Sequence, residues 1–276
     1  MNPAATPGST FKQQELSGWD GKAKTYGDYA GTITTQIVQP LLDAAGVKAD
    51  TRLLDIACGP GYVTGTAVAR GARSLGVDFA PSMVSEATKN FPKAEFRHGD
   101  AEALEFDNAT FDAVVCAFGI GHLPDPERAI SEAYRVLRSG GRYAFSWWCS
   151  PEKHQFYGLV FGAVKAHGSF DVPLPPAPPI FRFSDPKECR RSLAAAGFAD
   201  VAITEHELVY EPKSTQGILN LIYKSAVRMA MVLESQEKQA LERIHAAILN
   251  GAQAYKVGES FRIGWPAIIA TGTKSS

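Results

Sequence analysis

Cysteine is scarce in this chain, which has only Cys58, Cys116, Cys149 and Cys189 among its 276 residues. These four are far apart and include no CxxC pair, a pattern that excludes a disulfide framework and a zinc knuckle. No two of the six histidines stand at the HxxxH spacing of helical metal sites. We therefore expect a reduced, cytoplasmic protein that holds no metal.

An excess of charge of one sign is lacking too, as are long apolar runs. The chain carries 28 Lys and Arg against 29 Asp and Glu, so it has no basic excess to attract nucleic acid. Its apolar stretches, such as 158–164, are far shorter than the ~20 residues that cross a bilayer. The first ten residues show neither the basic nor the apolar part of a secretory signal. We expect a globular protein without nucleic-acid or membrane partners.

Strand-like and helical segments alternate over about a hundred residues. Strands are predicted at 52–57, 74–77, 95–98, 111–117 and 142–149, with helices at 62–70, 81–90 and 127–137. This alternation predicts an α/β fold, a doubly wound sheet with right-handed crossovers. Two later strands, at 201–210 and 265–271, would complete a mostly parallel sheet of seven strands.

The remaining segments suggest a division of the chain into a tail, a core and a lid. Residues 1–18 are predicted as a flexible tail, and 19–150 as the core with an N-terminal helical stretch at 19–45. After the fifth and sixth strands, 151–183 and 212–258 are read as insertions that form a helical lid, the second with two helices between 214 and 251. Residues 184–211 and 259–276 would complete the core sheet. The proline-rich stretch 173–179 is read as a stiff spacer rather than as a ligand for a partner domain.

In an open α/β sheet, ligands bind beyond the carboxyl ends of the strands. The first strand ends in Asp55-Ile-Ala-Cys-Gly-Pro-Gly61, where two glycines permit a tight turn and close approach to a ligand. A dinucleotide fingerprint requires a third glycine three residues later, and Thr64 stands there. The turn therefore disfavours a nicotinamide dinucleotide, although a glycine turn without any ligand is the other reading.

Acidic residues follow the next two strands. Asp78, 17 residues beyond Gly61, ends the second strand, where a carboxylate can accept both hydroxyls of a ribose. Asp100 follows the third strand, where it can accept from an exocyclic amine or simply cap a turn. The fourth strand ends in Cys116-Ala-Phe-Gly-Ile-Gly-His122, whose small residues leave room for a ligand.

Four motifs in order, LLDIACGPG, GVDFAPSMV, GDAEAL and FDAVVCAFGIGHLPD, with RVLRSGGR after them, resemble the class I S-adenosylmethionine-dependent methyltransferases. Within that class, the chain is most similar to the ubiquinone/menaquinone methyltransferase-like group of small-molecule enzymes. The resemblance covers residues 19–149 and implies a Rossmann-like methyltransferase fold. It also implies S-adenosylmethionine as cofactor and S-adenosylhomocysteine as product.

The resemblance also implies which residues bind the cofactor. The first motif would hold its methionine portion, Asp78 its ribose, and the residues after the second and third strands its adenine. A helix with Tyr26 and Tyr29 would close over it from the amino-terminal side. The implied cofactor residues are Tyr26, Asp55, Ala57, Gly59, Gly61, Asp78, Phe79, Met83, Asp100, Ala101, Ala117, Phe118 and His122.

Catalysis is harder to assign, because this chain has Gly121-His122 where relatives often carry two adjacent histidines. His122 is the first candidate for a general base, followed by His154 and Tyr26. A histidine that bonds the backbone or faces solvent is the simpler reading for each histidine. The lid aromatics are read mainly as core packing, with some facing an apolar substrate; they are Phe156, Tyr157, Phe161, Phe181, Phe183 and Tyr223.

The sequence thus predicts in-line methyl transfer from S-adenosylmethionine to O, C or N of a small, largely apolar metabolite. One alternative is a protein of the same fold that binds this cofactor without transferring methyl, as a scaffold or a rearrangement catalyst. A nicotinamide-dependent oxidoreductase is a more distant alternative. Both a monomer and a homodimer are compatible with the sequence.

Overall fold

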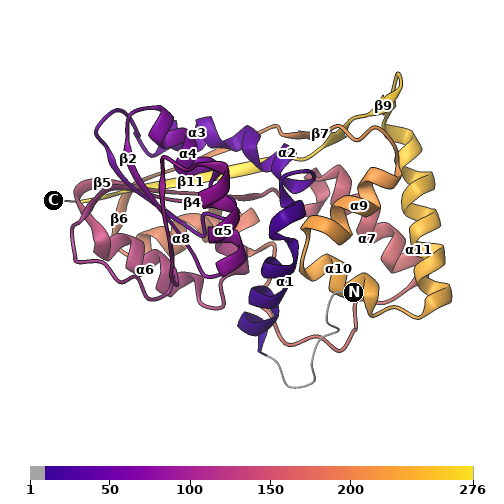
Figure 1. Ribbon diagram of the computed structural model, residues 1–276. Helices are drawn as coiled ribbons and strands as arrows, with labels where there is room; N and C mark the ends of the chain where they lie inside the picture. Colours follow the sequence, from indigo (N-terminus) through magenta and orange to yellow (C-terminus); the bar gives the residue numbers. More distant parts are fainter. Residues whose placement is uncertain (1–9, 276) are drawn as a thin grey trace.

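A seven-stranded sheet forms the centre of the computed structural model, which describes residues 10–275 (Figure 1). The strand order is β3-β2-β1-β4-β5-β11-β6. The first five strands along this order are parallel, and β11 runs antiparallel to β5 and β6. The strands are β1 (Arg52–Ile56), β2 (Arg73–Asp78), β3 (Glu95–His98), β4 (Phe111–Ala117), β5 (Leu137–Trp148), β6 (Phe198–His206) and β11 (Ala267–Lys274). The prediction of a mostly parallel, seven-stranded sheet is confirmed.

The central strands are apolar along almost their whole length because helices cover both faces of a parallel sheet. In β1, Leu53, Leu54 and Ile56 have no exposed surface, and in β4 the same holds for Val114 and Val115. Removing this apolar surface from water stabilises the sheet, and it fixes the carboxyl ends of β1, β2 and β4 side by side at one edge.

Eleven α-helices lie within residues 10–275, and none of them is both long and apolar enough to cross a bilayer. Those around the sheet are α3 (Val38–Ala44), α4 (Tyr62–Ala69), α5 (Pro81–Asn90), α6 (Pro126–Val136) and α8 (Pro186–Ala195). The others are α1 (Phe11–Tyr26), α2 (Ala30–Thr34), α7 (Gln155–His167), α9 (Gln216–Ser225), α10 (Arg228–Glu234) and α11 (Lys238–Gly251). Two short ladders complete the fold: β7 (Val209–Tyr210) with β10 (Ile263–Gly264), and β8 (Lys256–Val257) with β9 (Ser260–Phe261).

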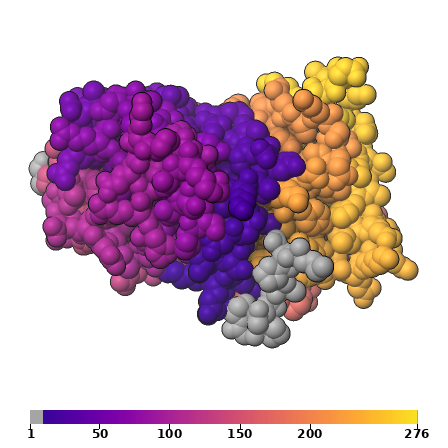
Figure 2. Space-filling view, in the orientation of Figure 1, coloured from indigo at the N-terminus to yellow at the C-terminus, as the bar shows by residue number. Residues whose placement is uncertain are grey.

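Helices α7, α9, α10 and α11 gather at one end of the molecule, and α1 runs between them and the sheet (Figures 1 and 2). Polar contacts hold α1 on both sides. Asp20 accepts a hydrogen bond from the amide of Ser82 at the start of α5. On the other side, the buried Lys22 donates to the carbonyl of Tyr223 in α9. Helix α1 therefore joins the helical end of the molecule to the sheet.

The amino-terminal predictions need correction. Part of the predicted tail, residues 1–9, lies outside the described residues, but α1 begins at Phe11 and so includes most of the rest. The predicted helical stretch 19–45 is divided into α1, α2, a 3₁₀ turn at Thr35–Ile37 and α3. The chain turns between α1 and α2 around the Tyr62 hydroxyl, which would lie 2.7 Å from a Cβ added at Gly27.

The segment after β7 contains three helices rather than the predicted two. Ala226 has an extended backbone, with φ −113° and ψ 134°, and this separates α9 from α10. The break places the buried Val227 against α1, where a Cβ on Gly18 would lie only 2.3 Å from Val227 Cγ1. Packing against α1 therefore overrides the continuous helical periodicity of 219–233.

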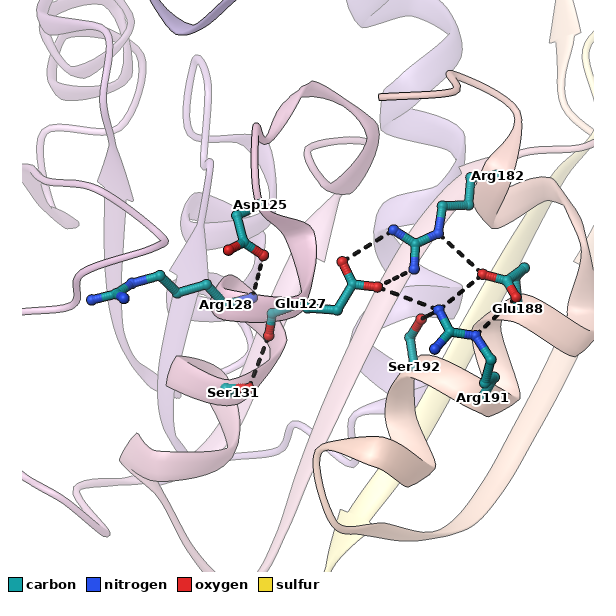
Figure 3. Close-up of polar contacts among 8 residues, drawn as sticks. All are labelled: Asp125, Glu127, Arg128, Ser131, Arg182, Glu188, Arg191 and Ser192. Carbon is teal, nitrogen blue, oxygen red and sulfur yellow. Dashed lines mark hydrogen bonds and ion pairs between the residues drawn. The ribbon is translucent and has the colours of Figure 1, made fainter. Parts of the chain in front are cut away.

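An ion-pair network ties the segment after the proline-rich loop to two helices of the core (Figure 3). The guanidinium of Arg182 lies between Glu127 of α6 and Glu188 of α8, with Nε 3.0 Å from Glu188 Oε2 and Nη1 3.0 Å from Glu127 Oε2. Arg191 extends the network through Glu188. These contacts fix the point at which the chain returns from the helical end to the sheet.

Candidate active site

The turn after β1 uses its two glycines differently. Both have left-handed backbones, with φ of 51° at Gly59 and 87° at Gly61. A Cβ added at Gly61 would lie 2.7 Å from the ring of Phe96, so this glycine is required for packing. A Cβ added at Gly59 would meet no atom within 4 Å. Gly59 therefore borders open space, where a ligand can approach the backbone.

Asp55 supports this turn from behind. Its side chain is fully buried, and Oδ2 accepts hydrogen bonds from the amide and the hydroxyl of Thr64, at 3.1 and 2.7 Å. Burial raises the pKa of the Asp55 carboxyl to about 7, against the opposing effect of the Thr64 hydrogen bonds. Oδ2 holds the start of α4, whereas Oδ1 is buried without a hydrogen-bond partner in the described part of the chain, and Asp55 is not among the residues that line the cavity.

Asp78, at the end of β2, does face the cavity. Its Oδ2 accepts from the amide of Gly59 at 2.8 Å, and its Oδ1 accepts from the amide of Ala80 at 2.9 Å. A carboxylate offers about four acceptor sites, so two remain for a ligand. Burial raises the pKa of Asp78 to about 6, partly offset by these two amide hydrogen bonds.

From its position, Asp100 can fill both roles that the sequence left open, capping a turn and accepting a hydrogen bond from a ligand amine. Its Oδ1 accepts from the amide of Glu102 at 3.0 Å, which is a turn-capping bond. Its Oδ2 lies 2.6 Å from Nζ of Lys12, which also lies 2.9 Å from Glu102 Oε2. Asp100 still lines the cavity, and Lys12 of α1 covers its outer side. A ligand amine at Asp100 would therefore lie beside Lys12.

These strand ends surround one cavity. All of the predicted cofactor residues line it except Asp55 and Gly61: Tyr26, Ala57, Gly59, Asp78, Phe79, Met83, Asp100, Ala101, Ala117, Phe118 and His122. Its floor is formed by the β1 and β4 ends, which approach each other so closely that a Cβ on Gly119 would lie 2.6 Å from that of Ala57. Ala57 and Phe118 both have a positive φ of 54°, a strained conformation of the kind found at ligand sites.

His122 is held by a buried carboxylate from α1. Its Nδ1 lies 2.9 Å from Oε2 of Glu15, which is 1% exposed and also accepts from Trp19 Nε1 at 2.9 Å. The indole rings of Trp19 and Trp147 meet the imidazole edge-on. The two atoms lie at ion-pair distance without the geometry of a hydrogen bond, so either ring nitrogen of His122 can carry the proton. A simple backbone hydrogen bond of the His122 ring, the alternative reading, is not what the structure shows.

Burial affects the other two candidate bases, His154 and Tyr26, in different ways. His154 is 1% exposed among Trp148, Tyr157 and Trp265, and burial lowers its pKa to about 3. It lines neither the cavity at the strand ends nor the aromatic cavity beside it, so this geometry does not support His154 as a base. Tyr26 lines the cavity, but burial raises its pKa to about 12, which keeps the phenol protonated at neutral pH. Tyr26 can donate a hydrogen bond and cannot readily accept a proton.

A second cavity adjoins the first, between the strand ends and the helical end of the molecule. The two share Trp19, Tyr26, Phe118 and His122. The second cavity is walled largely by aromatic rings, and Phe118 stacks on Trp148 with ring centroids 3.9 Å apart. Of the aromatics predicted in the lid, Phe156, Tyr157 and Phe161 line this cavity, whereas Phe181, Phe183 and Tyr223 do not. Within residues 10–275, no three His, Cys, Asp or Glu side chains gather in the manner of a metal site.

Four residues that the sequence analysis missed lie on one face of α1. Lys12, Glu15, Trp19 and Lys22, together with the predicted Tyr26, recur at steps of three and four, and they face the cavity or the elements beside it. This spacing is a helical signal in itself. It was hidden because three of the five side chains are charged, whereas the buried face of a helix is ordinarily apolar.

Comparison with known proteins places this geometry in a family. A model for the methyltransferase domain matches residues 54–145. A demethylmenaquinone methyltransferase of Thermus thermophilus is 34% identical over 176 residues, which cover 57% of this chain and 79% of that protein. An uncharacterized protein of Mycobacterium tuberculosis is 30% identical over 161 residues, 55% of this chain and 57% of its own.

Among solved structures, the YcgJ protein of Bacillus subtilis superposes with a TM-score of 0.57 at 18% identity, over 87% of this chain and 99% of its own. A phosphoethanolamine N-methyltransferase of Haemonchus contortus, solved with S-adenosylhomocysteine, gives a TM-score of 0.53 at 17% identity, over 87% of this chain and 53% of its own. Both share the fold. The Thermus relative, of which more than two thirds is covered, shows that the chain belongs to the class I S-adenosylmethionine-dependent methyltransferases, in the quinone methyltransferase-like group.

Proposed function

We propose that this enzyme methylates a small, largely apolar metabolite, with the cofactor in the cavity at the strand ends and the acceptor in the aromatic cavity beside it. The observation that carries the proposal is that the two cavities share Phe118 and His122. A methyl group presented at that junction would face an acceptor in the aromatic cavity directly.

The first cavity fits S-adenosylmethionine in three respects. The open space beside Gly59 admits the amino-acid portion close to the backbone. Asp78 has free acceptor sites for the ribose hydroxyls, and Phe79, Met83, Asp100 and Ala101 would border the adenine. Tyr26 and Lys12 on α1 would cover the bound cofactor.

The acceptor would lie under the helices of the two insertions, 151–183 and 212–258, which we regard as the lid. The walls of the aromatic cavity suit an apolar, planar ring system. The Thermus relative is named for methylating demethylmenaquinone, a quinone. A quinol-like or other aromatic acceptor is therefore the class that we propose for this chain, with O, C or N as the methylated atom.

The cofactor supplies a methyl group that is already activated on a sulfonium, so the protein chiefly has to align and desolvate the reactants. A planar acceptor seated against the aromatic walls would displace water from the junction. The His122 imidazole accepts the proton that leaves the acceptor, and the buried Glu15 carboxylate beside it keeps the ring in place. Tyr26 stays protonated, and its hydroxyl donates to Oγ1 of Thr34 at 3.3 Å.

A methyl-transfer assay with three planar acceptors tests this proposal. The enzyme is incubated with S-adenosylmethionine and either 2-naphthol, 1,4-dihydroxynaphthalene kept reduced, or 1-naphthylamine, which offer O, C or N. We expect release of S-adenosylhomocysteine with at least one acceptor, together with a product one methylene heavier. Cofactor binding without acceptor-dependent release from any of the three would reject the proposed acceptor class and favour a cofactor-binding protein that transfers no methyl.

A further inference from the structure

A partly buried cation projects into the aromatic cavity. Arg228, the first residue of α10, lines that cavity and not the cofactor cavity. Its Nη2 donates to the carbonyl of Pro175 at 2.9 Å. Its Nη1 is buried, yet it has no hydrogen-bond partner within residues 10–275.

A guanidinium with a buried, unpaired donor is costly, because it loses its water without gaining another partner. Arginine remains charged at any ordinary pH, so it cannot avoid this cost by losing a proton. Burial lowers the pKa of Arg228, and the Glu15 carboxylate opposes this effect. The Oε2 atom of Glu15 is already engaged by Trp19 and His122, so it does not replace a direct partner for Nη1.

Aromatic rings form most of the cavity wall around Arg228. Trp148, Phe156 and Trp265 line the same cavity, and the rings of Phe156 and Trp265 stack with centroids 4.1 Å apart. A purely apolar acceptor would fill these walls and leave Nη1 unpaired. An acceptor that also carries a negative oxygen would satisfy both features at once.

We propose that Arg228 binds an anionic oxygen of the acceptor, so that the substrate is an aromatic acid or an ionised phenol and not a neutral hydrocarbon-like metabolite. This inference rests on the proposed function, since it takes the aromatic cavity as the acceptor site. The negative oxygen would lie at the Arg228 end, and the atom to be methylated would lie toward His122 and the cofactor cavity. Arg228 would thereby fix which end of the substrate faces the methyl group.

Binding of matched ligand pairs tests the assignment. With the enzyme saturated in S-adenosylhomocysteine at pH 8, calorimetry compares 2-naphthoate with neutral 2-naphthamide, and 4-nitrophenolate with 4-nitroanisole. We expect the wild-type enzyme to bind the anion of at least one pair at least about tenfold more tightly than the neutral ligand of that pair. Arg228→Met should abolish that preference, and Arg228→Lys should retain part of it. Arg243→Met, which changes an exposed arginine of α11, should leave the preference intact.

The outcomes separate the two proposals. A preference for naphthoate alone assigns a carboxylate, and one for nitrophenolate alone assigns a phenolate. No preference in the wild-type enzyme, no binding of any probe, or a preference that survives in Arg228→Met overturns the role of Arg228. Each of these results can occur while S-adenosylhomocysteine binds normally, whereas failure of the wild-type enzyme to bind S-adenosylhomocysteine counts against the proposed function itself.

Discussion

Glu15 and His122 are far apart in the sequence, yet Oε2 of the first lies 2.9 Å from Nδ1 of the second. The carboxylate comes from α1 and the imidazole from the turn after β4. Because Glu15 is only 1% exposed, the packing around it fixes the position of its side chain. The pair has the arrangement of a general base oriented by a second residue.

This pairing predicts separate effects on turnover and on cofactor binding. His122→Ala should lower kcat about 100-fold or more, and Glu15→Gln about tenfold or more, if His122 accepts the proton. Affinity for S-adenosylhomocysteine should change much less in Glu15→Gln, because Glu15 does not line the cofactor cavity. Glu105→Gln, which changes an exposed acid, is the matched control. Unchanged kcat in both active-site variants would show that the pair is structural.

Two glycines with similar backbones provide a second test. Gly59 and Gly258 have φ of 51° and 59°, and an added Cβ would meet nothing within 4 Å at either position. Alanine should therefore destabilise the protein by a similar amount at each, about 1–2 kcal/mol for the left-handed backbone. Only Gly59→Ala should also weaken binding of S-adenosylhomocysteine, since its methyl group enters the proposed cofactor space. Equal affinity in the two variants would move the cofactor away from Gly59.

The raised pKa of Asp55 predicts a pH dependence of stability. The folded state binds this proton up to about pH 7, whereas the unfolded chain releases it near the usual aspartate pKa of 3.8. The free energy of unfolding should therefore fall as the pH rises between these two values. In Asp55→Asn the fall should be smaller, because asparagine does not titrate. Urea unfolding from pH 4.5 to 8 measures this slope, and a slope identical to the wild-type one would contradict the assignment.

The ion pairs around Arg182 should give the free energy of unfolding a pH dependence of the opposite sign. Hydrogen bonds from Arg191 and Arg182 lower the pKa of Glu188 to about 2, and Arg182 also lowers that of Glu127. The stabilisation from these pairs is present above the usual glutamate pKa and is lost as the pH falls toward about 2. Arg182→Met should cost about 1 kcal/mol at pH 7, since the pairs are partly exposed, and less at pH 3. An equal loss of stability at pH 7 and pH 3 would mean that Arg182 stabilises the protein mainly through packing of its aliphatic stem.

The strands and their terminal acids were predictable from sequence because their signals are local. The predicted bounds of β3, β4 and α5 agree with the structure, since apolar runs end at turn residues or at Pro81. The rule that ligands lie beyond the carboxyl ends of parallel strands singled out the residues at those ends, and the resemblance to the methyltransferase class supplied their predicted cofactor roles.

The role of α1 was not predictable in the same way. Its inward face carries Lys12, Glu15 and Lys22, whose partners Asp100, His122 and the Tyr223 carbonyl are distant in the sequence. A charged residue becomes buried when a partner elsewhere compensates it, and hydrophobic periodicity contains no such information. The separation of α9 from α10 at Ala226 depends on α1 for the same reason.

Asp55 shows a further limit. The motif identifies an acid at the end of β1, but it does not tell whether the carboxylate faces the ligand or the following helix. The structure turns it toward Thr64, where its hydrogen bonds hold the glycine turn. The contribution of Asp55 to cofactor binding is therefore expected to be indirect.

The central claim is that S-adenosylmethionine binds at the strand ends with its ribose on Asp78. Calorimetric titration of the purified protein with S-adenosylhomocysteine tests it most directly, with Asp78→Asn and the exposed-site control Asp107→Asn titrated alongside. We expect the wild-type and control proteins to bind equally, and Asp78→Asn to bind about tenfold more weakly or worse while remaining folded. Equal binding by all three proteins, or no binding by the wild-type protein, would contradict the claim.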